Sequence, residues 1–117
     1  SHPLTIGIDL DDVLLDFNTS LCVFHNETYG TTYKRSDITR YRFDEIWNVT
    51  LDEILKRIAE FYQHDHHWNS MPLEGAVEAI RTLHKKHKLV IVTAKPDYLR
   101  EKTQIWLNKH YGDVFKE

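Results

Sequence analysis

The feature that most constrains this chain is an apolar run over residues 4–14 that also carries Asp9, Asp11 and Asp12. The Ile and Leu residues of this run favour a strand buried on both faces, with Asp9 at its carboxyl end. Open α/β sheets place their ligands at that edge. Three carboxylates packed beside an apolar strand repel one another and lose hydration. A bound divalent cation would relieve that cost, and oxygen ligands favour Mg²⁺, so we expect Asp9 and Asp11 to be metal ligands. The alternative is that these residues only cap the next helix, although one cap needs one Asp and not three.

A second apolar run, residues 88–93, predicts another buried strand that ends at Thr93. We expect the two strands to be parallel neighbours joined by a right-handed crossover. The hydroxyl of Thr93 would then lie near Asp9 and could hold phosphate oxygens. An ordinary β-branched strand residue that bonds its own turn is the alternative for Thr93.

The segment between the two strands is much longer than a minimal βαβ crossover and has apolar helical periodicity of its own. Thr50 and Glu53 form a capping-box pattern at the start of its clearest helix. We therefore expect a helical insertion over residues 16–72, placed as a lid above the acidic site, and a core made of residues 1–15 and 73–117. The helices expected along the chain cover residues 14–29, 44–47, 51–63, 74–87 and 98–110.

Composition excludes several classes of protein. The chain has 117 residues, a formal net charge of −3 and no basic stripe, so a nucleic-acid polymer is not an expected partner. One cysteine excludes an internal disulfide and fits a reducing, cytoplasmic compartment. No apolar run is long enough to cross a membrane, so no membrane partner is expected. The first three residues, Ser1-His2-Pro3, lack a starting Met and are expected to be a cloning remnant.

A cluster of histidines, His64-Asp65-His66-His67, invites a zinc interpretation. Its spacing matches no established zinc pattern. A polar cluster after a helix is more often a solvated loop, and a loop is what we predict for these residues.

Two segments resemble motifs of the haloacid dehalogenase (HAD) superfamily. Its first motif, Asp-x-Asp-x-(Thr/Val)-(Leu/Val) after a hydrophobic strand, is similar to Asp9-Leu10-Asp11-Asp12-Val13-Leu14. Its second motif, a Thr or Ser that ends another core strand, is similar to Lys88-Leu89-Val90-Ile91-Val92-Thr93. The chain also resembles the C-type 5'-nucleotidase family, which includes 5'(3')-deoxyribonucleotidases, through residues 6–18 and 71–96.

This resemblance implies an α/β fold with a Rossmann-like core of parallel strands and a helical cap inserted after the first strand. It implies that Asp9 attacks phosphorus, that Asp11 is the general acid and base, and that the backbone carbonyl of Asp11 is a further ligand of Mg²⁺. It also implies phosphate binding by Thr93, Ala94 and Lys95. The family often has Gly at the position of Asp12 and Ser in place of Ala94-Lys95.

The superfamily's third motif, a Lys, and its fourth, an acidic pair, are not recognisable after the second strand. Lys102 and Lys109 lie on the last predicted helix, and Asp113 and Glu117 follow no new strand. We therefore expect an incomplete sheet, and either a chain that is part of a longer enzyme or a homo-oligomer that completes the sheet.

The function expected from these features is Mg²⁺-dependent hydrolysis of a small phosphate monoester, with nucleotides as the leading candidates. Phe17, Trp47 and Trp68 could stack on a base, although each also fits an ordinary core position. One alternative is an inactive HAD-like fragment that binds Mg²⁺, phosphate or a partner chain. Another is a phosphorelay receiver, which would need a mid-chain strand ending in a phospho-accepting Asp that this sequence does not offer.

Overall fold

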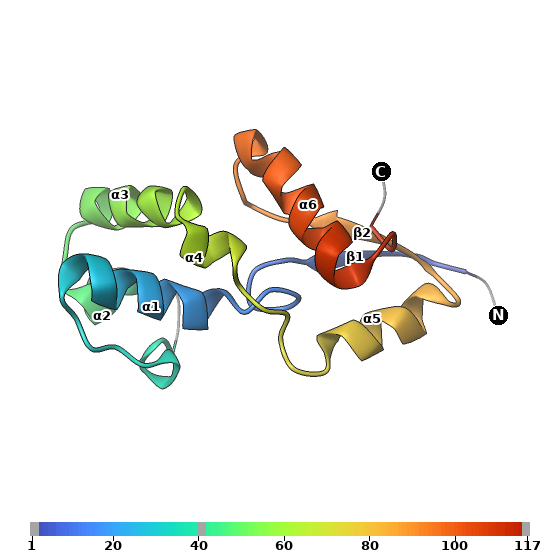
Figure 1. Ribbon diagram of the computed structural model, residues 1–117, viewed down its shortest axis with the longest axis horizontal. Coiled ribbons are helices and arrows are strands. Elements are labelled where there is room, and N and C mark those ends of the chain that lie inside the picture. Colours follow the sequence, from blue (N-terminus) through green and yellow to red (C-terminus); the bar gives the residue numbers. More distant parts are fainter. Residues whose placement is uncertain (1–2, 40–41, 116–117) are drawn as a thin grey trace. The chain divides into compact units, whose positions relative to one another are not determined.

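The chain divides into two compact units, one formed by Ser1–Asp16 with Met71–Glu117 and the other by Phe17–Ser70. The computed structural model describes residues 3–39 and 42–115, so Ser1, His2 and Glu117 lie outside the described part. The two junctions fall within two residues of those that the sequence indicates. Each unit is described separately below (Figure 1).

The first unit is built on two parallel strands, β1 (Thr5–Asp9) and β2 (Lys88–Val92). Gly7 pairs with Val90 and Asp9 with Val92, so the two strands end at the same level. The predicted parallel pairing is therefore confirmed, and the described residues form a two-stranded sheet. Parallel strands bring their carboxyl ends to one edge, which places the residues after Asp9 beside those after Val92.

The two faces of this sheet differ in exposure. Leu89 is buried and Ile6 is half-buried, whereas Gly7, Asp9 and Val92 are exposed, with Val92 at 61%. The prediction of a strand buried on both faces is therefore wrong for β1, in which every residue is exposed or half-buried. The close approach of Val92 explains why glycine occupies position 7, since a Cβ there would lie 2.8 Å from a methyl group of Val92.

A tight loop over residues 10–15 follows β1. The backbone amides of Leu14 and Leu15 donate to the carbonyl of Leu10, and the amide of Asp12 donates to the carbonyl of Leu15 at 2.7 Å. Asp12 has a φ of 59°, a left-handed conformation that Asp tolerates better than most residues. The predicted start of a helix at residue 14 is wrong for this reason. The helix begins at Phe17, after the loop has closed on itself.

The remaining elements of the first unit are α5 (Ala76–His84), a short 3₁₀ turn η2 (Asp97–Leu99) and α6 (Arg100–Tyr111). Both helices were expected, and they are shorter than predicted at one or both ends. Tyr111 fixes the loop after β1, because its hydroxyl donates to the carbonyl of Leu14 at 2.7 Å. The last turn of α6 thus holds the segment that carries Asp11.

The second unit is helical throughout. Its elements are α1 (Phe17–Tyr29), the 3₁₀ turn η1 (Arg35–Asp37), α2 (Phe43–Trp47), α3 (Leu51–Tyr62) and α4 (Asp65–Trp68). Thr50 caps α3 as predicted, since its hydroxyl accepts the amide of Glu53. The carboxylate of Glu53 does not complete the capping box and pairs with Arg57 at 2.8 Å.

The predicted solvated loop at residues 64–68 is wrong, because α4 forms there. His67 is fully buried, and its ring lies edge-on to those of Phe61, Phe17 and Trp68. An aromatic cage of this kind stabilises a turn that periodicity alone does not reveal. The short length of α4 explains why sequence patterning missed it.

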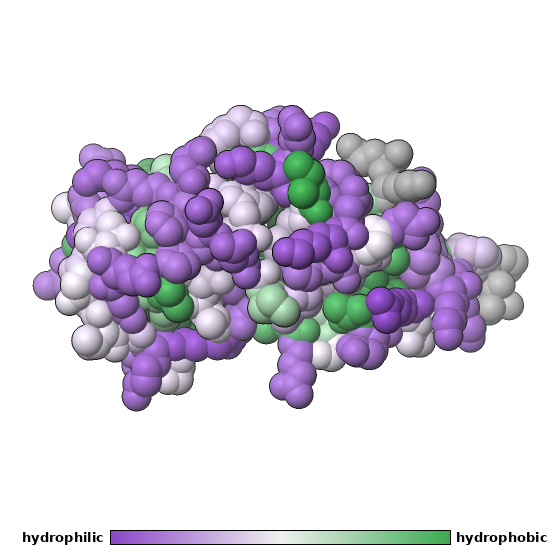
Figure 2. Space-filling view, in the orientation of Figure 1, coloured by the Kyte–Doolittle hydropathy of each residue, from purple (hydrophilic) through white to green (hydrophobic). Residues whose placement is uncertain are grey.

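The described residues contain no helix that is both long and apolar enough to traverse a bilayer. Figure 2 shows a face on which hydrophilic residues predominate and apolar residues gather in small patches.

Candidate functional site

The candidate site lies at the carboxyl ends of β1 and β2, within the first unit. Asp9 is the last residue of β1, and its Oδ1 accepts the amide of Leu10 at 2.7 Å. This bond directs one carboxylate oxygen back onto the chain. The residue is otherwise exposed, so its second oxygen can meet a ligand.

Asp11 lies two residues further on, in the closed loop, and it is paired with Lys95. The Nζ of Lys95 lies 3.1 Å from Oδ2 of Asp11, and the Lys95 side chain is only 1% exposed against 23% for Asp11. This ion pair joins the segments that follow the two strands. The sequence predicts that Lys95 binds phosphate and gives no indication of its partner, although Asp11 comes two positions and Lys95 three positions after a strand end.

Thr93 is exposed and directly follows β2, which ends one residue earlier than predicted. Its Oγ1 accepts the backbone amide of Lys95 at 3.1 Å. The amide of Lys95 is therefore engaged within the loop. The hydroxyl hydrogen of Thr93 and the neighbouring amide of Ala94 are the groups of this segment that suit an anionic ligand.

Burial dominates the electrostatics of the ion pair. It raises the pKa of Asp11, and the nearby carboxylates of Asp9 and Asp12 raise it further, while Lys95 opposes the change. Burial also lowers the pKa of Lys95, against the effect of Asp11. A carboxyl group with a raised pKa is suited to giving and taking a proton near neutral pH.

The residues present fit a magnesium ion that is only partly held by protein. Oδ1 of Asp11 is buried and has no hydrogen-bond partner, an arrangement that a cation or donor would relieve. Mg²⁺ commonly takes one or two carboxylates and completes its shell with water and substrate phosphate. Asp9 and Asp11 supply that number, and among residues 3–39 and 42–115 no group of three or more acidic, His or Cys side chains could hold a metal.

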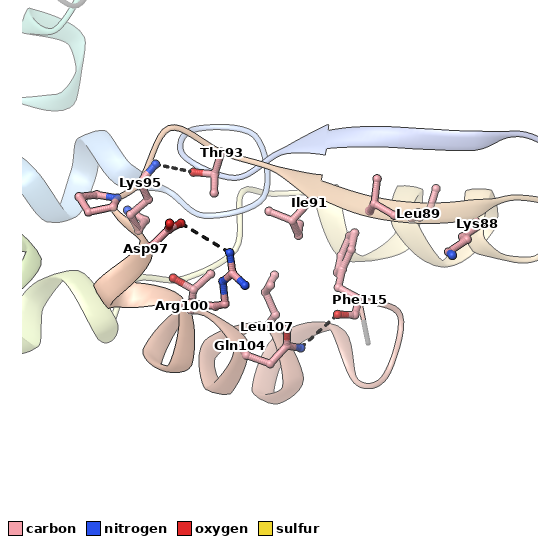
Figure 3. A pocket seen from close by; sticks show the side chains of 13 residues that line it. Lys88, Leu89, Ile91, Thr93, Lys95, Asp97, Arg100, Gln104, Leu107 and Phe115 are labelled. Atoms are coloured by element: carbon pink, nitrogen blue, oxygen red, sulfur yellow. Dashed lines mark hydrogen bonds and ion pairs between the residues drawn. The ribbon is translucent and has the colours of Figure 1, made fainter. Parts of the chain in front are cut away.

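A cavity of about 450 Å³ lies between β2 and α6 in the same unit (Figure 3). Thr93 and Lys95 line one end, and Leu107 and Phe115 form part of its apolar wall. Neither Asp9 nor Asp11 lines it. The cavity therefore adjoins the segment after β2 without containing the acidic pair.

The three aromatic residues considered for base stacking belong to the second unit. Phe17 and Trp47 are buried, and the Trp47 ring stacks on His25 at 4.3 Å and on Phe43 at 4.6 Å. Phe17 and Trp47 thus lie in the core of this unit. Trp68 is partly exposed, with its indole N–H donated to the carbonyl of Tyr62. A substrate role for any of the three stays a prediction.

The histidine segment shows no metal-binding arrangement among the described residues. His66 pairs with Glu27, while His67 is enclosed by rings.

The fold and site define the chain as an α/β protein of the HAD type. A solved structure described as "putative HAD-hydrolase YfnB from Bacillus subtilis bound to magnesium" matches 99% of this chain and 64% of that one, with a TM-score of 0.60 and 19% identity. The family model "5' nucleotidase, deoxy (Pyrimidine), cytosolic type C protein" matches residues 2–117, and the chain belongs to this family.

A curated relative, "Putative nucleotidase YqfW" of Bacillus subtilis (strain 168), is 23% identical over 118 residues. The match covers 95% of this chain and 58% of that protein. The chain thus spans about three-fifths of the length of the proteins it matches here.

Proposed function

We propose that this chain carries the reaction centre of a Mg²⁺-dependent phosphomonoester hydrolase that acts on nucleotides. The observation that carries the proposal is the placement of Asp9 and Asp11 at the end of β1, beside the end of β2 with Thr93 and Lys95. Family membership supports a nucleotidase, and the magnesium-bound HAD neighbour supports the choice of ion.

In the first step, the free oxygen of Asp9 attacks phosphorus and forms an aspartyl-phosphate while the bond to the leaving oxygen breaks. Asp11 gives its proton to that oxygen, which leaves as an alcohol. The raised pKa of Asp11 favours this role, since a protonated carboxyl group must be available.

In the second step, Asp11 takes a proton from water, and the resulting oxygen attacks phosphorus. The bond to Asp9 breaks, inorganic phosphate leaves, and both carboxyl groups return to their first state. The hydroxyl of Thr93 and the amide of Ala94 hold the phosphate oxygens throughout. Mg²⁺, held by Asp9 and Asp11, would neutralise charge on the phosphate so that an anionic carboxylate can approach it.

The test is hydrolysis of p-nitrophenyl phosphate and of nucleoside 5'-monophosphates, with Mg²⁺ and with excess chelator. We expect turnover that needs Mg²⁺ and is about 1,000-fold slower or worse in Asp9→Asn, because the nucleophile is lost. Asp11→Asn should slow turnover about 100-fold. Asp52→Asn, an exposed carboxylate on α3, is the matched control and should be unchanged. Equal rates for the natural chain and Asp9→Asn would refute the proposal.

A second candidate is a protein that binds Mg²⁺ and phosphate without turnover. It is favoured by the sequence of residues 94–117, in which neither a third-motif Lys nor a fourth-motif acidic pair is recognisable. Calorimetry with Mg²⁺ and inorganic phosphate distinguishes the two. Binding that Asp9→Asn abolishes, in a protein that hydrolyses none of the substrates, would support this candidate over the enzyme.

A further inference from the structure

We propose that Lys95 is a positioning residue that fixes the carboxylate of Asp11, and that it does not bind the substrate phosphate through its side chain. This inference rests on the proposed function, because it assigns a role within that reaction. It changes the expectation for Lys95, which sequence analysis placed among the phosphate ligands.

The side chain of Lys95 is enclosed by the protein. Its side chain is 1% exposed, less than that of the carboxylate it meets, and Nζ lies 3.1 Å from Oδ2 of Asp11. Thr93 and Asp9 are exposed, so they are more accessible to an incoming phosphate than this ammonium group is.

Movement of the Lys95 side chain to a phosphate would remove the hydrogen-bond partner of Asp11. In the described part of the chain, Oδ2 of Asp11 accepts a hydrogen bond from Lys95, and Oδ1 of Asp11 has no hydrogen-bond partner. Without Lys95 neither carboxyl oxygen would have a partner, although Oδ1 is buried, and an unpaired buried carboxyl oxygen is unfavourable. The pair is therefore expected to persist when substrate binds.

Lys95 and Asp11 both project from backbone segments that hydrogen bonds hold in place. The backbone amide of Lys95 donates to Thr93, which fixes the turn from which the lysine projects. Asp11 lies in the loop closed by Leu10 and Leu15 and held by Tyr111. Because hydrogen bonds hold both segments in place, the ion pair can fix the Asp11 carboxylate at one position.

The test compares Lys95→Met, which keeps length and loses charge, with Lys95→Arg and with Lys109→Met, an exposed lysine on α6. Turnover of p-nitrophenyl phosphate with Mg²⁺ and inhibition by inorganic phosphate are measured for each. A positioning role predicts that Lys95→Met lowers kcat about 10- to 100-fold while KM and the phosphate inhibition constant change less than twofold. Lys95→Arg should recover most of kcat, and Lys109→Met should match the natural chain.

Three results would overturn the proposal. KM and the inhibition constant could rise tenfold with kcat unchanged, as a phosphate ligand requires. All three constants could stay the same in folded Lys95→Met, as a purely structural residue requires. Lys95→Arg could be as slow as Lys95→Met, which would exclude a role carried by the charge.

A second measurement separates this proposal from the proposed function and does not depend on turnover. In protein labelled with ¹⁵N-lysine, the buried pair predicts one Nζ correlation protected from exchange, which disappears in Lys95→Met and persists in Lys109→Met. Turnover without such a signal would refute the positioning role alone. The signal in a chain without turnover would refute the proposed function and leave the ion pair in place.

Discussion

Acidification is expected to weaken the helical unit Phe17–Ser70 through one buried side chain, His25. This residue is 1% exposed and its ring stacks on Trp47. Nη1 of Arg57 lies 2.9 Å from Nε2 of His25. Because arginine can only donate hydrogen bonds, Nε2 of His25 must be the acceptor. The ring proton is then on Nδ1 and is donated to Thr31 at 2.8 Å. Protonation of His25 would place two donors face to face in a buried site.

The size of the effect follows from the pKa of His25. Burial first, and then the charge of Arg57, lower that pKa from 6.5 to about 4. Between these values the unfolded chain binds a proton that the folded chain does not, so stability is present above pH 6.5 and is lost as pH falls toward 4. The linkage relation gives a loss of about 2 to 3 kcal/mol between pH 7 and pH 4.5.

The assay is urea unfolding followed by tryptophan fluorescence at a series of pH values from 7 to 4.5. His25→Phe keeps a ring beside Trp47 and removes the titration, and His84→Phe is the control at an exposed histidine of α5. His25→Phe should lose stability at pH 7, because Arg57 and Thr31 lose a partner, and should show a flatter pH dependence. Carboxylate titration is common to all three proteins and cancels in the differences. Equal slopes for His25→Phe and His84→Phe would refute the reasoning.

Three further substitutions test the packing that supports the site. Gly7→Ala should cost about 1 kcal/mol in urea unfolding, because its Cβ would lie 2.8 Å from Val92; unchanged stability would show that Val92 moves aside freely. Tyr111→Phe should cost about 1 kcal/mol in the same assay, since the carbonyl of Leu14 loses a buried donor, and no loss would mean that the bond is replaced by water. Thr50→Ala should lower the free energy of unfolding by about 1 kcal/mol through loss of the helix cap, and Thr50→Ser should restore it.

The sequence predicts the two strands and most helices because their patterns are local. Apolar runs indicate β1 and β2, and the cap at Thr50 marks the start of α3. The place of Asp9 at a strand end follows from the same pattern. Parallel pairing then requires only the rule for crossovers, and with it the nearness of Thr93.

The features that the sequence does not predict depend on contacts between distant residues. The pair of Asp11 and Lys95 joins positions 84 apart, and no local pattern distinguishes this lysine from an exposed one. His67 looks polar until Phe61 and its neighbours enclose it. The loop that delays α1 is fixed by backbone bonds to Leu10, which apolar spacing cannot reveal.

Few residues hold the candidate site in place, so a single substitution outside it should be able to disrupt it. The ion pair of Asp11 and Lys95 is held by two short segments, one closed on Leu10 and anchored by Tyr111, the other turned by Thr93. A substitution that loosens either segment should separate two charges that are each costly to bury alone. Tyr111→Phe, which touches no ligand-binding group, should therefore weaken the protection of the Lys95 Nζ correlation as well as the stability of the fold. Loss of stability without any change in that correlation would show that the pair does not depend on its anchoring.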